Sequence, residues 1–192
     1  MGATASTMLD LGTVLPPFRL RDLDGKAVTS NDFSSAKGVL VAFLCPHCPF
    51  VRHIRTEFAQ LAADAQRRGL AVIAVNSNDV TAFPEDGPEG MRAEVKEAGY
   101  TFPYLFDESQ DVAKAFHAAC TPDLFLFDGR SRLVYRGQFD ESRPKSDIPV
   151  TGKDLKAAID AVLDGTPMPV QRPSLGCNIK WLKGNEPEYF KH

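Results

Sequence analysis

The chain has 192 residues, of which 43% are hydrophobic and 24% are charged, and these values are typical of one ordinary globular domain. Its net charge is −3, and the sequence contains no basic stretch. Both observations argue against a nucleic-acid partner. No apolar run approaches the about 18 residues of a membrane span, and the first residues lack the features of a secretory signal. We therefore expect a cytoplasmic protein without a nucleic-acid or membrane partner.

The first predicted elements form a β-hairpin. We expect residues 1–12 to be a flexible terminus. Residues 13–33 contain two short extended segments joined by Asp24-Gly25, a dipeptide typical of two-residue turns. The hairpin precedes the apolar segments of the chain, so it would extend the sheet at its N-terminal end.

A strand–helix–strand unit follows the hairpin. Two uninterrupted apolar runs, Val39–Leu44 and Leu70–Val75, indicate strands that are buried on both faces. Between them, apolar side chains recur at helical spacing and predict a helix; these side chains are Val51, Ile54, Phe58, Leu61 and Ala65. Gly69 would end this helix. This order predicts two parallel strands joined by a right-handed crossover.

The second half of the chain mixes helices and strands. Residues 80–90 form a loop rich in proline, glycine and acidic residues, whose charges we expect to be solvated. Helical patterns cover residues 89–98, 108–119 and 153–164, and extended segments cover 102–106, 124–127 and 133–135. The tail, 166–192, is expected to dock on the body. The order predicts a single α/β domain over 1–192 with a thioredoxin-like fold, in which helices flank a central mixed sheet.

Two of the four cysteines lie between the first buried strand and the long helix, in the segment Cys45-Pro46-His47-Cys48. Cysteines in a cytoplasmic protein more often have redox, catalytic or metal-binding roles than structural ones. A helix start stabilises a thiolate and lowers its pKa below the free value of about 8.5. We therefore predict a thiol-disulfide oxidoreductase in which Cys45, at an exposed mouth, is the nucleophile. Cys48, one turn inward, would resolve the mixed disulfide.

The two residues between these cysteines are predicted to tune them. Pro46 suits the start of a helix, and His47 adds a group that can be cationic near neutral pH and can donate to a thiolate. Both favour the reduced, ionised form, which predicts a more oxidising centre. The preceding strand, 39–44, contains no carboxylate, so proton transfer would use His47 or water.

Several motifs give the chain a family resemblance. They are Phe18-Arg-Leu-Arg-Asp-Leu-Asp-Gly25, the Cys-Pro-His-Cys-Pro segment, Val75-Asn-Ser-Asn-Asp79, and Ala119-Cys-Thr-Pro-Asp-Leu-Phe-Leu-Phe-Asp128. The chain resembles the redoxin/AhpC-TSA branch of the thioredoxin superfamily, especially bacterial members that end in Gly-Cys-Asn-Ile-Lys-Trp, here 176–181. The resemblance implies a dithiol site at Cys45 and Cys48 and a cis peptide bond before Pro122. In such folds a substrate chain pairs beside this proline, so Thr121 and Pro122 are predicted to bind substrate.

Alternative functions remain open at this point. One is a thiol peroxidase that uses Cys45, although the peroxiredoxin pattern Pro-x-x-x-Thr/Ser-x-x-Cys precedes neither active-site cysteine. Another is a non-catalytic module that binds metal or protein. A zinc or copper set of Cys45, Cys48, His117 and Cys120 is conceivable, but we predict no metal and no cofactor. The expected partners are protein or small-molecule disulfides and thiols, together with an unidentified reductase or oxidant.

The remaining cysteines, Cys120 and Cys177, are candidates for accessory thiols. Free cysteines often act as small hydrophobic residues in the core, and this is one interpretation of Cys120 and Cys177. The others are a Cys120–Cys177 disulfide, or a third thiol that relays oxidation to the Cys45–Cys48 pair. Cys120 lies two residues before Pro122, so we expect it near the site.

Overall fold

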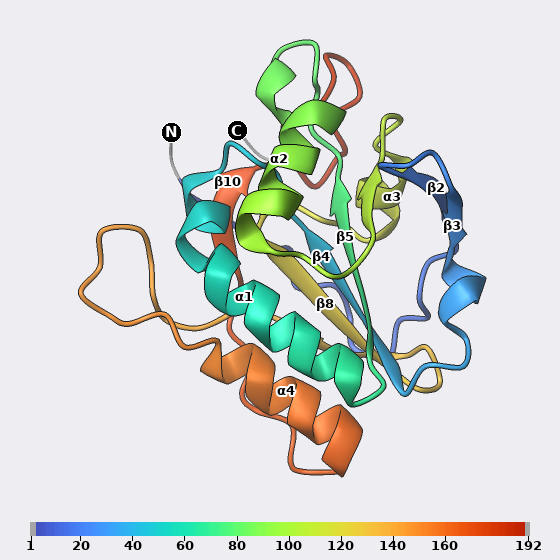
Figure 1. Cartoon of the computed structure of the whole chain (residues 1–192), viewed down its shortest axis with the longest axis vertical. Coiled ribbons are helices and arrows are strands. Elements are labelled where there is room, and N and C mark those ends of the chain that lie inside the picture. Colours follow the sequence, from blue (N-terminus) through green and yellow to red (C-terminus); the bar gives the residue numbers. More distant parts are fainter. Residues whose placement is uncertain (1–2, 191–192) are drawn as a thin grey trace.

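The structure is a computed structural model that describes residues 3–190 (Figure 1). Its centre is a seven-stranded mixed sheet with the strand order β3-β2-β6-β5-β4-β8-β9. The strands are β2 (Arg19–Asp22), β3 (Ala27–Thr29), β4 (Gly38–Phe43), β5 (Ala71–Asn76), β6 (Tyr104–Phe106), β8 (Asp123–Asp128) and β9 (Leu133–Arg136). β5 runs parallel to β4 and β6, and β8 runs antiparallel to β4. The predicted α/β fold with a mixed central sheet is confirmed.

Helices cover both faces of this sheet. The α1 (Pro49–Arg67), α2 (Pro88–Ala98) and α4 (Lys153–Asp164) helices contribute to one hydrophobic cluster, and α3 (Asp111–Ala115) contributes to the other. Two short 3₁₀ helices, η1 (Ser30–Phe33) and η2 (Pro84–Asp86), lie in the connections. Every residue of β4 is buried between these layers, as its uninterrupted apolar run predicts. Within residues 3–190, no helix combines the length and apolarity needed to cross a bilayer.

A small second sheet joins both ends of the described chain. It has the order β1-β10-β7, with β1 (Thr4–Ala5), β10 (Leu175–Asn178) and β7 (Cys120–Thr121). β10 is antiparallel to both neighbours. Figure 1 shows β10 beside the start of α1. Within the terminus expected to be flexible, 1–12, the backbone of β1 pairs with that of the tail, and residues 1–2 lie outside the described residues.

The predicted helix over 108–119 is much shorter in the structure. Gln110 and His117 have φ angles of 65° and 51°, and this left-handed conformation is incompatible with a continuing right-handed helix. The long helix does end where Gly69 predicts, since this residue follows the C-cap Arg68 with a φ of 101°. A glycine adopts such an angle without a Cβ clash.

Candidate functional site

The Cys45–Cys48 segment lies at the predicted strand-to-helix junction. Cys45 follows β4, and Cys48 is the N-cap residue of α1, whose first residue is Pro49. The carbonyl of Pro46 accepts a hydrogen bond from Arg52 Nε at 2.8 Å, which ties the loop to the helix. All four cysteines of the chain are free thiols.

Both thiols of the segment are buried, with 0% exposure for Cys45 and for Cys48. The prediction that Cys45 lies at an exposed mouth is therefore wrong for this structure. The tail supplies the physical reason: β10 pairs with β7 and contacts α1, so Cys177 joins the hydrophobic cluster that holds the pair. Sequence reasoning expected a docked tail but did not indicate that it would cover the cysteines.

Thr121 contacts both thiols of the pair. Its Oγ1 lies 3.2 Å from Cys45 Sγ, and its carbonyl oxygen accepts a hydrogen bond from Cys48 Sγ at 3.0 Å. The following peptide bond, to Pro122, is cis, as predicted. The edge that was expected to receive a substrate strand is already paired, because β10 lies along β7 with Cys177 opposite Thr121.

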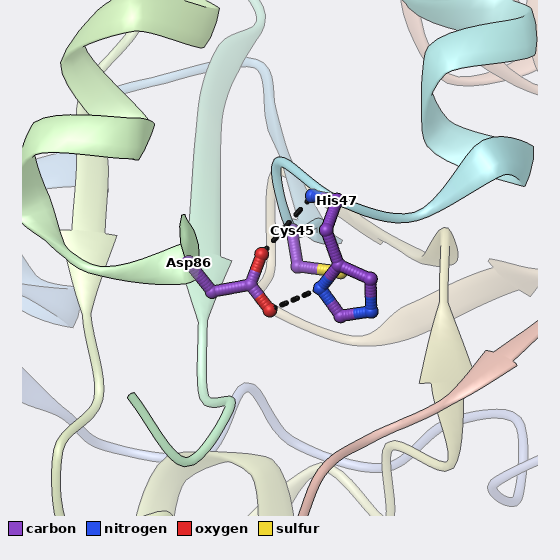
Figure 2. A group of neighbouring side chains, drawn as sticks. All are labelled: Cys45, His47 and Asp86. Atoms are coloured by element: carbon purple, nitrogen blue, oxygen red, sulfur yellow. Dashed lines mark hydrogen bonds and ion pairs between the residues drawn. The ribbon is translucent and has the colours of Figure 1, made fainter. Parts of the chain in front are cut away.

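A buried carboxylate holds the third residue of the segment. Asp86, from η2, accepts the backbone N–H of His47 at 3.0 Å through Oδ1, and its Oδ2 lies 2.5 Å from His47 Nδ1 (Figure 2). Asn78 donates to the same Oδ2 at 2.8 Å. The expectation that the charges of residues 80–90 are solvated is wrong for Asp86, which is 0% exposed. Sequence reasoning missed this residue, since nothing in the acidic loop distinguishes it from its neighbours.

The Asp86–His47 pair lies against the first thiol. A His47 ring nitrogen, a carboxylate oxygen of Asp86 and Cys45 Sγ all lie within 4.8 Å of one another, and Figure 2 shows the Cys45 sulfur behind the imidazole. The ring of Phe83 stacks on the imidazole of His47, with the two ring centroids 5.3 Å apart. The imidazole has 16% side-chain exposure, so this neighbour of Cys45 is partly open to solvent.

This group is also the only set of His, Cys and acidic side chains within residues 3–190 that could hold a metal ion. Two ligands of a tetrahedral Zn²⁺ ion lie about 3.3 Å apart, given metal–ligand distances of about 2.0 Å. His47 Nδ1 and Asp86 Oδ2 are closer, at 2.5 Å, so they share a proton rather than an ion. The alternative set with His117 and Cys120 is not assembled, because the exposed His117 stacks on Tyr189.

The two thiols of the pair differ in the direction in which their surroundings shift the pKa. Hydrogen bonding to Cys48, burial and the negative charge of Asp86 raise the pKa of Cys45. Hydrogen bonds from the thiols of Cys177 and Cys45 lower the pKa of Cys48. The lower pKa of the two therefore belongs to Cys48, and the expectation of a lowered pKa at Cys45 is wrong. The physical reasons are the hydrogen bond to Cys48 and burial, and the charge of Asp86 adds to them by opposing the effect that His47 was expected to have.

A second buried carboxyl group lies beneath the site. Glu94 of α2 accepts hydrogen bonds from Tyr104 at 3.0 Å and from Tyr100 at 3.3 Å. Burial raises the pKa of Glu94 to about 7. Sequence reasoning missed this residue as well, although Glu94 follows the buried Met91 at helical spacing, so an acidic residue on the apolar face was a readable signal.

The accessory thiols have different surroundings. Cys120 is 0% exposed, and its Sγ donates weakly to the carbonyl of Pro122 at 3.5 Å; burial raises its pKa. Hydrogen bonding to Cys48 and burial raise the pKa of Cys177. Cys120 and Cys177 are free thiols in the structure and form no disulfide with each other, and Cys177 lies opposite Thr121.

Comparisons with known proteins identify the family and the fold of the chain. Residues 11–136 match the AhpC/TSA family. Thiol-disulfide oxidoreductase ResA of Geobacillus thermodenitrificans is 26% identical over 161 residues, which cover 83% of this chain and 82% of ResA. A hypothetical protein of Sinorhizobium meliloti is 53% identical, with a TM-score of 0.92 over 94% of this chain and 100% of its own. The thioredoxin domain of a Bacteroides vulgatus thiol-disulfide oxidoreductase has the same fold, with a TM-score of 0.57, 22% identity and coverage of 70% and 90%.

Proposed function

Because the chain belongs to the AhpC/TSA family, we propose that it is a thiol-disulfide oxidoreductase whose reacting groups are Cys45 and Cys48. The observation that carries the proposal is the contact of both thiols with Thr121, directly before the cis proline. The similarity to proteins named thiol-disulfide oxidoreductases supports the class of reaction. Disulfides of proteins or small molecules are the substrates of such a dithiol.

The reaction starts at Cys45, which lies beside the partly exposed imidazole of His47, whereas the Cys48 thiol is held by the carbonyl oxygen of Thr121. Cys45 must lose its proton before it attacks, because only the thiolate is a nucleophile. The Asp86–His47 pair, within 4.8 Å of the sulfur, is the proton acceptor in this proposal. It takes the place of the strand carboxylate that this chain lacks.

The two steps then follow thiol-disulfide exchange. The Cys45 thiolate attacks one sulfur of the substrate disulfide, that S–S bond breaks, and the leaving thiolate takes a proton. The Cys48 thiolate next attacks Cys45 Sγ in the mixed disulfide and releases the second substrate thiol. Two electrons have passed to the substrate, and a Cys45–Cys48 disulfide remains. The reverse sequence oxidises a dithiol substrate.

Insulin reduction, with dithiothreitol as the source of electrons, tests the proposal. We expect Cys45→Ser and Cys48→Ser each to lose the activity above the uncatalysed background, while Cys120→Ser, the matched control in the same region, retains it. Wild-type activity in Cys45→Ser would contradict the proposal. If the wild-type protein instead leaves insulin intact and reacts rapidly and saturably with hydrogen peroxide to give a Cys45 sulfenic acid, the thiol-peroxidase alternative replaces it.

A further inference from the structure

A third thiol reaches the dithiol from the C-terminal tail. β10 lies antiparallel on β7 with Cys177 opposite Thr121, and Thr121 is the residue that contacts both Cys45 and Cys48. Cys177 is 8% exposed and belongs to the same hydrophobic cluster as the two active-site cysteines. Three thiols, from the strand end, the helix start and the tail, therefore converge beside one threonine.

The tail strand lies where an added substrate strand would lie. Proteins that bind an extended chain by strand addition use an open backbone edge, and here β10 takes the edge of β7 next to the cis proline. The fit is tight at Gly176, where a Cβ atom would lie 2.0 Å from the carbonyl oxygen of Thr121. The tail thus presents Cys177 to the dithiol in the manner of a bound substrate.

The surroundings of Cys177 favour Cys48, rather than Cys120, as the thiol with which it reacts. Cys177 lies opposite Thr121 across the β7–β10 pair, and the carbonyl oxygen of Thr121 accepts the hydrogen bond of Cys48 Sγ at 3.0 Å. Interaction with Cys177 also lowers the pKa of Cys48. Cys120, the other accessory thiol, directs its Sγ to backbone carbonyls, those of Pro122 at 3.5 Å and Ser174 at 4.0 Å. Cys48 is therefore the active-site thiol that shares its contact residue, Thr121, with the strand position of Cys177.

We propose that Cys177 is a third redox-active thiol, which converts the Cys45–Cys48 disulfide into a Cys48–Cys177 disulfide. The proposal rests on the proposed function, which supplies the first disulfide. Cys177 Sγ attacks Cys48 Sγ, the Cys45–Cys48 bond breaks, and the proton lost by Cys177 ends on the Cys45 thiolate that leaves. One disulfide replaces another, so the step needs no oxidant. The raised pKa of Cys45 means that this residue ends the step as a neutral thiol.

Peptide mapping under non-reducing conditions tests this step. Each protein is oxidised with one equivalent of diamide, quenched with acid, denatured, alkylated and digested with trypsin. Cys45 and Cys48 fall in the peptide 38–52, Cys177 in 157–180 and Cys120 in 115–130. We expect Cys45→Ser to give the 38–52 peptide linked to 157–180, and we expect this link to be lost in Cys48→Ser. Cys120→Ser is the matched control and should behave as wild type.

Peptide mapping of the wild-type protein tests the same step without relying on a variant that could fail to fold. In glutathione redox buffers, the proposal predicts a fraction of molecules with the same linked peptide and an alkylated Cys45. If the wild-type protein forms the Cys45–Cys48 disulfide and reduces insulin, but Cys177 is alkylated in every sample, this inference is wrong and the proposed function stands. If the wild-type protein forms no Cys45–Cys48 disulfide and leaves insulin intact, both fail together.

Discussion

The carboxylate of Asp86 is buried and lies 2.5 Å from Nδ1 of His47. This contact joins η2 to the loop that separates the two active-site cysteines, and it places a negative charge beside Cys45. The charge contributes to the raised pKa of Cys45. A histidine that was expected to favour a thiolate at Cys45 is therefore paired with a group that disfavours one there.

Asp86→Asn should make the centre more oxidising than that of the wild-type protein. Removal of the negative charge beside the two thiols favours the thiolate form of the reduced pair, which stabilises the reduced form relative to the disulfide. Each unit of pKa corresponds to a rise of about 30 mV in the two-electron reduction potential. Equilibration with glutathione redox buffers measures the potential, and Glu85→Gln, an exposed neighbour in η2, is the control. An unchanged or lower potential in Asp86→Asn would contradict the assigned role of Asp86.

Gly176→Ala should expose the buried thiols. The new methyl group cannot fit 2.0 Å from the carbonyl of Thr121, so β10 must shift away from β7. We expect faster alkylation of Cys48 and Cys177 by iodoacetamide in the native protein, at least several-fold, measured by mass spectrometry over time. Leu175→Ala changes a more exposed side chain of the same strand and should alkylate at the wild-type rate. Equal rates for Gly176→Ala and wild type would show that the tail does not shield the site.

Glu94 should make the free energy of unfolding fall as the pH rises. Its pKa is raised from 4.5 to about 7 in the folded protein, so between these values the folded state holds a proton that the unfolded state releases. Stability is therefore lost as the pH rises through this window, by about 3 kcal/mol. Urea unfolding at pH 5 and pH 8 should show this loss reduced by about that amount in Glu94→Gln.

The control for this measurement is Glu89→Gln, on the exposed side of the same helix. It should show the same pH dependence as the wild-type protein. Asp123 also has a pKa raised to about 7 by burial, and it contributes equally to all three proteins. An identical pH dependence in Glu94→Gln and wild type would contradict the buried, protonated state of Glu94.

The elements that sequence patterns predicted well are those whose signal is local. The apolar run of β4 and the helical spacing in α1 each report burial within one segment, and together they located the Cys45–Cys48 junction. The hairpin of β2 and β3 followed from its Asp24-Gly25 turn. Each of these signals depends on residues within a few positions of one another.

The features that escaped prediction depend on contacts between distant segments. Asp86 and His47 lie in different loops, and only the folded sheet brings them together. β10 contains a glycine and has neither alternation nor an apolar run, so its pairing with β7 has no local signal. The burial of Cys45 and Cys48 follows from that pairing, and for this reason the sequence alone suggested an exposed nucleophile.

The most direct test of the central claim is the capture of a mixed disulfide on Cys45. Cys48→Ser removes the resolving thiol, so reaction with glutathione disulfide should leave one glutathione bound through Cys45, identified by peptide mass spectrometry and released by dithiothreitol. The account predicts that this adduct accumulates in Cys48→Ser, while the wild-type protein passes through it to the Cys45–Cys48 disulfide. Adduct on Cys120 alone, or none on Cys45 under conditions that oxidise the wild-type protein, would contradict it.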